Sequence, residues 1–445
     1  MTPFTLDNKK ILRKASRERV ADSLASIPKS VARRKWLYKN NRYRVNCTKQ
    51  FESDLKANPS TIDHRDLTHY IIASAPTHAI DGWSYLGRSI DCTLRGDTYS
   101  AIHFAYYAEL RAAMSLLASE GIGVFSKWHA TIDDTGTCVP FPHNSNRNPV
   151  RRSSAFGTHK VVWPMLQYWS TLKRASDLLD ELISPSSIQM STWLGDILGT
   201  SIRVRSIAQE WLTCWGLDIS VVEDDHDNRN LASYRPSEFR KPIALDVHEI
   251  VQFVEELWAL FEPSSLGRFP LIEKHLIKKA WQASGSNVPT IVELEGKGLD
   301  RVNANEWNSF LNNPIIPLPL EYGDKKSLLE DSYCHLQVIS RAALLLFLST
   351  LASRKLLVNA AISKDTLSFW WKHHGVERAL WKNGNLPNDP LDLWKDIDTA
   401  IADSRTWRNL NPSGSVSIRD WREDQSNALN NLGGFELIGM LGLLS

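Results

Sequence analysis

The sequence predicts a mostly α-helical protein, and two kinds of pattern support this. Apolar residues recur at intervals of three and four in residues 162–182 and 250–261, the spacing that places them on one face of a helix. The most apolar run, AALLLFLSTLA at 342–352, is only 11 residues long. A membrane-spanning helix needs about 20 apolar residues, so we interpret this run as part of a buried helix.

Several helix ends can be predicted from their flanking residues. Asp97 is a suitable N-cap for a helix over 98–118, and Gly121 stands where that helix would end. Proline is unfavourable inside a helix, so Pro164 predicts that the helix of the 162–182 run begins near Trp163 or kinks. A long buried helix is expected over 327–362, followed by a short helix that Gly384 ends.

A β-hairpin is predicted as a small insertion in this helical core. The segments KWHATI and TCVPF flank the turn-forming DDTG, in which Gly136 can adopt a positive φ. The Pro-rich segment at 313–320 cannot lie in a helix interior and suggests a boundary. We therefore divide the chain into a basic arm (1–60), a helical core (61–312) and a C-terminal helical region (321–445).

Charge is unevenly distributed along the chain. The 445 residues carry a net charge of only +2, but residues 1–50 hold 14 Lys and Arg against 3 Asp and Glu, which leaves that segment at +11 and the remainder at −9. Aromatic residues lie among the basic ones in ARRKWLYKNNRYR. Such a mixture suits phosphate contacts and base stacking, so the arm is predicted to bind nucleic acid, RNA more than DNA. The predicted contacts are Arg33, Arg34, Lys35, Arg42 and Arg44. The alternative is that the arm docks on the acidic body of its own chain or of a partner.

Familiar cofactor and metal signatures are missing from the sequence. There is no GxGxxG, GxxxxGK[ST], HExxH or GxSxG motif, and the five cysteines form no CxxC pair. The acidic patch at 223–227 is expected to be a solvated loop rather than a metal site. We predict no cofactor and no metal. Free cysteines and the absence of an apolar segment near the N-terminus favour a cytoplasmic protein with no membrane contact. The 17 tryptophans are scattered along the chain and are expected to be mainly structural.

The candidate catalytic pair is Arg152 and His159, which six residues separate. An imidazole can transfer the protons of RNA cleavage by internal transfer, and a guanidinium can stabilise the charge on the phosphate, without a metal. Arg151 would assist in binding phosphate. Accessory contacts are predicted on the 98–118 helix, where one stripe carries His103, Tyr107 and Arg111. Alternatively, this stripe is a buried polar network.

Three segments together resemble the HEPN superfamily of helical-bundle ribonucleases. They are DGWSYLGRSIDCTLRGDTYSAIHFAYYAELRAAMSLLASEGIGVF, FGTHKVVWPMLQYW and RNLASYRP, within residues 75–240. The sequence is similar in particular to divergent prokaryotic members, including YaaC-like ones, that are often associated with defence or toxin functions. The resemblance implies a HEPN-like bundle, an Arg-x4-6-His catalytic motif at Arg152 and His159, a histidine near the start of a helix, and a composite site formed by two protomers.

Two functions from different classes follow. The first is a metal-independent endoribonuclease, the effector of a prokaryotic defence or toxin system. The second is a catalytically inactive helical scaffold or nucleic-acid-binding subunit of an anti-phage defence complex. Ser153 stands where family members often carry Asn, Asp or His, and together with Pro164 it favours the second. Expected partners are RNA, a second copy of the chain or proteins of a defence complex.

Overall fold

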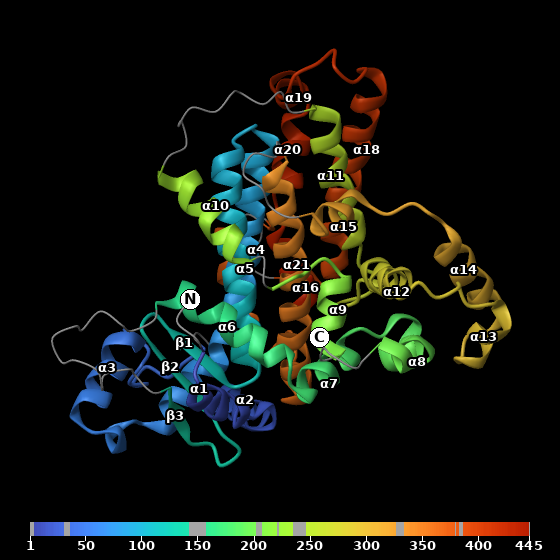
Figure 1. The fold of residues 1–445 in the computed structure, drawn as a ribbon. Coiled ribbons are helices and arrows are strands. Elements are labelled where there is room, and N and C mark those ends of the chain that lie inside the picture. Colours follow the sequence, from blue (N-terminus) through green and yellow to red (C-terminus); the bar gives the residue numbers. More distant parts are fainter. Residues whose placement is uncertain are drawn as a thin grey trace.

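The computed structural model describes residues 4–30, 36–141, 157–201, 207–219, 222–234, 246–325, 333–378, 380, 381 and 386–444. In this part of the chain the protein is mostly helical, with one small antiparallel sheet, as the sequence predicts (Figure 1). Three long helices form the centre: α4 (His64–Leu94), α5 (Thr98–Ser119) and α16 (Cys334–Asn359). Each of the three packs against the other two.

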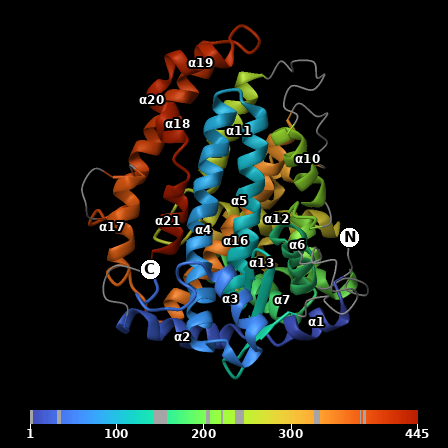
Figure 2. The same cartoon turned by 90° about the vertical axis from the view of Figure 1, so that its left-hand side faces the viewer.

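The helix predicted over 98–118 is confirmed with its ends. The side chain of Asp97 accepts a hydrogen bond from the backbone N–H of Ser100 at 3.1 Å, which caps α5. Gly121, with a φ of 84°, reverses the chain after α5. Because α4 and α5 are joined only by Arg95, Gly96 and Asp97, they run side by side through the middle of the molecule (Figure 2).

The apolar run at 342–352 lies within α16 and is buried, as predicted. Among the helices of the described residues, α16 alone has the length and hydropathy of a membrane span, and its most apolar stretch of 18 residues is entirely buried inside the protein. Trp83 of α4 donates its indole N–H to the hydroxyl of Thr350 at 2.8 Å. This helix therefore behaves as the core helix of a globular protein.

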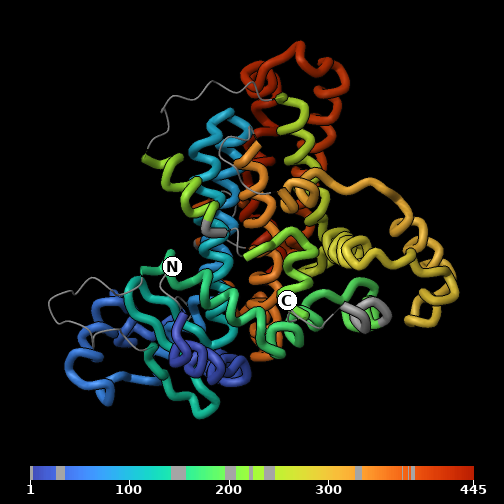
Figure 3. The backbone as a smooth tube through the Cα atoms, viewed as in Figure 1, coloured from blue at the N-terminus to red at the C-terminus, as the bar shows by residue number. Residues whose placement is uncertain are grey.

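The predicted hairpin is correct, but it belongs to a sheet of three strands. Strands β1 (Ile122–Phe125), β2 (Trp128–Ile132) and β3 (Cys138–Pro140) pair antiparallel in that order, with Ala130 opposite both Gly123 and Pro140. Gly136 takes a φ of 84° in the β2–β3 turn. The N-terminal helices α1 (Leu6–Arg13), α2 (Arg17–Ser30) and α3 (Cys47–Ala57) lie around this sheet at one end of the molecule (Figure 3).

Two predictions about secondary structure are wrong: that the helix containing Pro164 begins near Trp163, and that residues 223–227 form a solvated loop. The helix that carries His159, α6 (Thr158–Ser170), begins five residues before Trp163 and continues through Pro164, with one face of buried apolar side chains on both sides of the proline. The apolar run at 162–182 is divided between two helices, because the chain leaves α6 at Thr171 and Leu172 before α7 (Lys173–Leu182) starts. The acidic patch is not a solvated loop, because α10 (Val222–Tyr234) is a helix whose Asp225 is fully buried.

The remaining helices complete the molecule around the central three. Helix α10 packs on α5, and α21 (Glu436–Leu443) packs on α4 and α16. The Pro-rich segment at 313–320 runs into the first turn of α15 (Leu318–Gly323), which holds Pro319. Eight tryptophan side chains are less than 2% exposed, in agreement with a structural role. The other helical elements are η1 (Pro59–Thr61), η3 (Pro185–Ser187), α8 (Met190–Ser201), α9 (Ile207–Cys214), α11 (Val247–Leu260), α12 (Pro270–Ser284), α13 (Ile291–Gly296), α14 (Arg301–Asn312), α15 (Leu318–Gly323), α17 (Ser368–Glu377), η4 (Pro390–Leu393), α18 (Trp394–Leu410), α19 (Ile418–Asp424), α20 (Ser426–Leu432) and α21 (Glu436–Leu443).

Candidate functional site

His159 is the second residue of α6 and lies against the middle of α5. The N-cap residue of α6 is Gly157, which provides no side-chain hydrogen bond. Nδ1 of the half-buried His159 ring lies 3.0 Å from the hydroxyl of Tyr106, a residue of α5 that is fully buried. The two rings stack at an interplanar angle of 18°, with their centroids 5.7 Å apart. One ring nitrogen of His159 is thus held by a buried phenol.

Helix α10 brings a second histidine and an arginine to the same place. The ring centroid of His226 lies 5.6 Å from that of His159 and 5.6 Å from that of Tyr106. Arg229, three residues later on the same helix face, places its guanidinium carbon 5.5 Å from the ring centroid of Tyr106 and 5.1 Å from that of Tyr107. Its Nη2 donates a hydrogen bond to the Tyr107 hydroxyl at 2.9 Å.

The surroundings of His159 favour its neutral form. Burial lowers the pKa of His159 to about 4, and the positive charge of Arg229 and the neighbouring His226 act in the same direction. Burial also raises the pKa of Tyr106, so that its hydroxyl keeps its proton. At neutral pH His159 is therefore an uncharged imidazole, whose electron pair is available although the lowered pKa makes it a weaker base than an exposed histidine.

The contact between Tyr106 and His159 allows either direction of hydrogen bonding. With the proton on Nδ1, His159 donates to the Tyr106 oxygen and leaves the lone pair of Nε2 free to take a proton. The guanidinium of Arg229 supplies a fixed positive charge beside the ring. Imidazole, phenol and guanidinium together form a group suited to proton transfer next to an anionic substrate.

The predicted stripe of accessory residues is divided between two places. His103 and Tyr107 belong to the His159 cluster: their ring centroids are 5.0 Å apart, and Tyr107 lies 5.9 Å from His159. Nδ1 of His103 forms a hydrogen bond with Ser233 of α10 at 2.6 Å. Arg111, one turn further along α5, instead donates to Nδ1 of His78 on α4 at 3.0 Å.

Other predicted site residues lie elsewhere or outside the described residues. Arg151, Arg152, Arg33, Arg34 and Lys35 fall outside the described ranges. Arg42 forms an ion pair with the buried Asp54, and Arg44 donates to the carbonyl oxygen of Lys39 at 3.3 Å. The described part of the basic segment packs against the body, where Arg17 pairs with the buried Glu120 at 3.3 Å.

A buried ion pair holds α10 against the core. Both carboxylate oxygens of Asp225 accept hydrogen bonds from Arg341 of α16, at 2.8 and 3.0 Å. Glu109 of α5 lies 3.8 Å from the same guanidinium, and burial together with the charge of Asp225 raises the pKa of Glu109. Since Asp225 directly precedes His226, this pair fixes the position of α10 beside His159.

The sequence prediction missed His226 and Arg229. Their spacing of three residues is a helical signal, but we expected the acidic residues around them to be solvated. In the described residues, no group of three or more His, Cys, Asp or Glu side chains is arranged to hold a metal ion.

Comparison of the chain with protein-family models, curated proteins and solved structures finds no match. The resemblance to HEPN proteins therefore stays a prediction that depends on the quoted segments. The arrangement of residues around His159 is the observation from which a function can be argued.

Proposed function

We propose that this protein is a metal-independent endoribonuclease of the HEPN type, acting in the cytoplasm as the effector of a prokaryotic defence or toxin system. The observation that carries the proposal is the neutral His159, held by Tyr106 and flanked by His226 and Arg229. His159 is the general base. Arg152, with Arg151, keeps the phosphate-binding role that the resemblance implies, and Arg229 adds a second positive charge.

The proposed reaction is the internal transfer that breaks an RNA strand. His159 takes the proton of a 2′-hydroxyl, whose oxygen forms a bond with the adjacent phosphorus. The bond from phosphorus to the 5′-oxygen breaks, and this oxygen receives a proton from an acid. We assign this role to His226, whose ring centroid lies 5.6 Å from that of His159. The products are a 2′,3′-cyclic phosphate and a 5′-hydroxyl. The guanidinium groups stabilise the charge that develops on the phosphate oxygens.

Two further features support this proposal. His159 lies at the beginning of a helix in a helical bundle, which is where the resemblance expects the catalytic histidine. The basic N-terminal segment offers cationic side chains for an RNA backbone, among them the exposed Lys39 and Lys49. We also propose, from the resemblance alone, that two copies of the chain combine to form the complete site.

The competing proposal is a catalytically inactive scaffold of a defence complex. One observation favours it: Arg229 is only 8% exposed and already donates to Tyr107 and Asn230. In that case the cluster is a buried polar network that joins α5, α6 and α10.

A cleavage assay with the purified full chain separates the two proposals. Structured and unstructured RNAs are incubated in EDTA with wild type, His159→Ala, Arg152→Ala and Arg229→Gln, and each protein is checked by thermal unfolding. His248→Ala and Arg419→Gln are matched controls outside the cluster. The ribonuclease proposal predicts cleavage by wild type and both controls and a loss of at least 100-fold for His159→Ala. If all folded proteins cleave RNA equally, or none of them cleaves it, the scaffold proposal is supported.

A further inference from the structure

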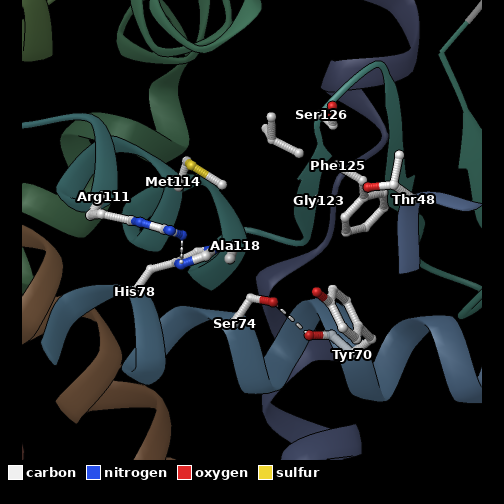
Figure 4. A pocket seen from close by; sticks show the side chains of 11 residues that line it. Thr48, Tyr70, Ser74, His78, Arg111, Met114, Ala118, Gly123, Phe125 and Ser126 are labelled. Atoms are coloured by element: carbon white, nitrogen blue, oxygen red, sulfur yellow. Dashed lines mark hydrogen bonds between the residues drawn. The ribbon is translucent and has the colours of Figure 1, made fainter. Parts of the chain in front are cut away.

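A cavity of about 160 Å³ lies between α3, α4, α5 and strand β1, outside the His159 cluster (Figure 4). Its two sides differ in chemistry. Arg111 and His78 form one side, and the rings of Phe125 and Tyr70 form the other, with centroids 5.6 Å apart. The other lining residues are Thr48, Ser74, Met114, Ala118, Gly123, Val124 and Ser126.

Arg111 contributes a positive charge whose one ion pair among the described residues, with Asp81, is long. Its hydrogen-bond partner is Nδ1 of His78, 3.0 Å away. Burial and the charge of Arg111 lower the pKa of His78 to about 3, so His78 is a neutral acceptor. The carboxylate of Asp81 lies 4.0 Å from Arg111, beyond hydrogen-bond distance. Both contacts are made by Nη1, so the N–H groups of Nε and Nη2 of this half-buried guanidinium can donate to an anion.

The rest of the cavity provides a polar edge and an apolar wall. Figure 4 shows the Tyr70 hydroxyl directed into the cavity, while the backbone oxygen of Tyr70 accepts the hydrogen bond of Ser74 at 2.7 Å. The side chains of Met114, Val124 and Phe125 are each less than 10% exposed. Thr48 and Ser126 are partly or fully exposed, so the cavity opens to solvent beside them.

The volume limits the occupant to a small molecule. An apolar cavity of about 150 Å³ in another protein binds one benzene molecule. The space between Arg111 and Phe125 thus matches a single aromatic ring, or an aliphatic body of the same size, with one charged group attached. Apolar walls favour such a body, and the guanidinium favours a carboxylate or phosphate group.

The geometry points to a binding site for a small organic anion, with its carboxylate or phosphate on Arg111 and its apolar body against Phe125 and Met114. This site does not depend on the proposed RNA cleavage. It does adjoin the His159 cluster: the Thr158 hydroxyl lies 3.5 Å from the carbonyl oxygen of Ser126, and Tyr107 precedes Arg111 by one helical turn. Because the two sites adjoin, a change at Arg111 could alter RNA cleavage through the His159 cluster. Binding to the cavity is therefore measured directly.

The test uses calorimetry and ligand-observed NMR on the purified full chain. The probes are phenyl phosphate and benzoate, which distinguish the two anionic groups, with inorganic phosphate and phenol as the separate halves. We expect saturable 1:1 binding of one or both ring-bearing anions, and binding at least 10-fold weaker for inorganic phosphate and for phenol. Arg111→Gln should weaken the binding at least 10-fold, and Arg95→Gln, an exposed arginine of the α4–α5 turn, should leave it unchanged.

A second variant protects the test against misfolding of Arg111→Gln. Thr48→Trp places a large side chain at the partly exposed mouth of the cavity and leaves Arg111 in place. It should block binding while the melting temperature stays near that of wild type. The proposal is overturned if neither ring-bearing anion binds wild type at low-millimolar concentration, or if folded Arg111→Gln and Thr48→Trp bind the probes as wild type does.

Discussion

The hydroxyl of Tyr106 and Nδ1 of His159 lie 3.0 Å apart, although the two residues are 53 positions apart in the chain. This contact joins α5 to the first turn of α6. It holds one nitrogen of a neutral imidazole, while α10 provides His226 and Arg229 on the neighbouring side. The candidate site is therefore produced by the packing of three helices, and its chemistry depends on how each of them is held.

Replacing Arg229 should change the titration of His159. Burial is the main cause of the low pKa of His159, and the charge of Arg229 is the next. Arg229→Gln removes that charge, so the pKa should rise from about 4 toward 6.5 without reaching it. NMR titration of the histidine rings measures this shift. An unchanged pKa in a folded Arg229→Gln protein would show that Arg229 does not act on His159.

Breaking the buried pair between Asp225 and Arg341 should destabilise the fold strongly. Arg341→Leu leaves the carboxylate of Asp225 without its cation, at a cost of about 3–5 kcal/mol in the free energy of unfolding. Arg419→Leu is the control, because Arg419 pairs with Glu423 on the surface and should change stability by less than about 1 kcal/mol. Urea denaturation compares the two. A loss below about 1 kcal/mol for Arg341→Leu would contradict the anchoring role of this pair.

Glu273 of α12 should make stability dependent on pH. Burial raises the pKa of Glu273 to about 7, while one oxygen accepts the N–H of Ser184 at 3.0 Å. Because the folded-state pKa lies above the unfolded value, the wild type loses stability as pH rises from about 4.5 through 7.

Glu273→Gln removes this dependence. The free energy of unfolding of the variant minus that of wild type should therefore increase by about 2–3 kcal/mol from about pH 5 to pH 8. Glu262→Gln, which removes a carboxylate from the surface, is the control for the substitution itself. Urea denaturation across the pH range measures both. If the free energies of unfolding of wild type and Glu273→Gln differ by the same amount at every pH, the pKa of Glu273 is not raised.

Gly123 is required by the packing of β1 rather than by its backbone angles. A Cβ atom at this position would lie 2.4 Å from Cζ of Phe125 and 2.6 Å from Cγ1 of Ile71. We expect Gly123→Ala to cost about 1–3 kcal/mol, measured by thermal or urea unfolding. Gly296→Ala, where an added Cβ meets open space, should be neutral or slightly stabilising. Equal stabilities for the two variants would contradict the close packing around β1.

Local patterns in the sequence were sufficient to predict much of the fold. Asp97, the N-cap, and Gly121, with its positive φ, mark the two ends of α5. The apolar spacing in 250–261 predicted α11. These features depend on residues that are near each other in the chain. Strand β1 was not predicted, because its four residues are all buried and show no alternation.

The candidate site was predicted only in part, for a physical reason. His159, His103 and Tyr107 were selected from the sequence, but Arg229 reaches them across 70 or more residues, through the packing of α10 on α5. The acidic character of 223–227 suggested solvent exposure. Only the buried Arg341, more than 100 residues further along, explains why Asp225 is inside.

The central claim, RNA cleavage with His159 as the base, is tested most directly by the ends of the product. A short RNA of defined sequence is incubated in EDTA with the purified full chain, and the fragments are analysed by mass spectrometry. Internal transfer predicts fragments with a 2′,3′-cyclic phosphate and a 5′-hydroxyl, absent for His159→Ala and present for His248→Ala. No cleavage by wild type, or 3′-hydroxyl ends that appear equally with His159→Ala, would contradict the account.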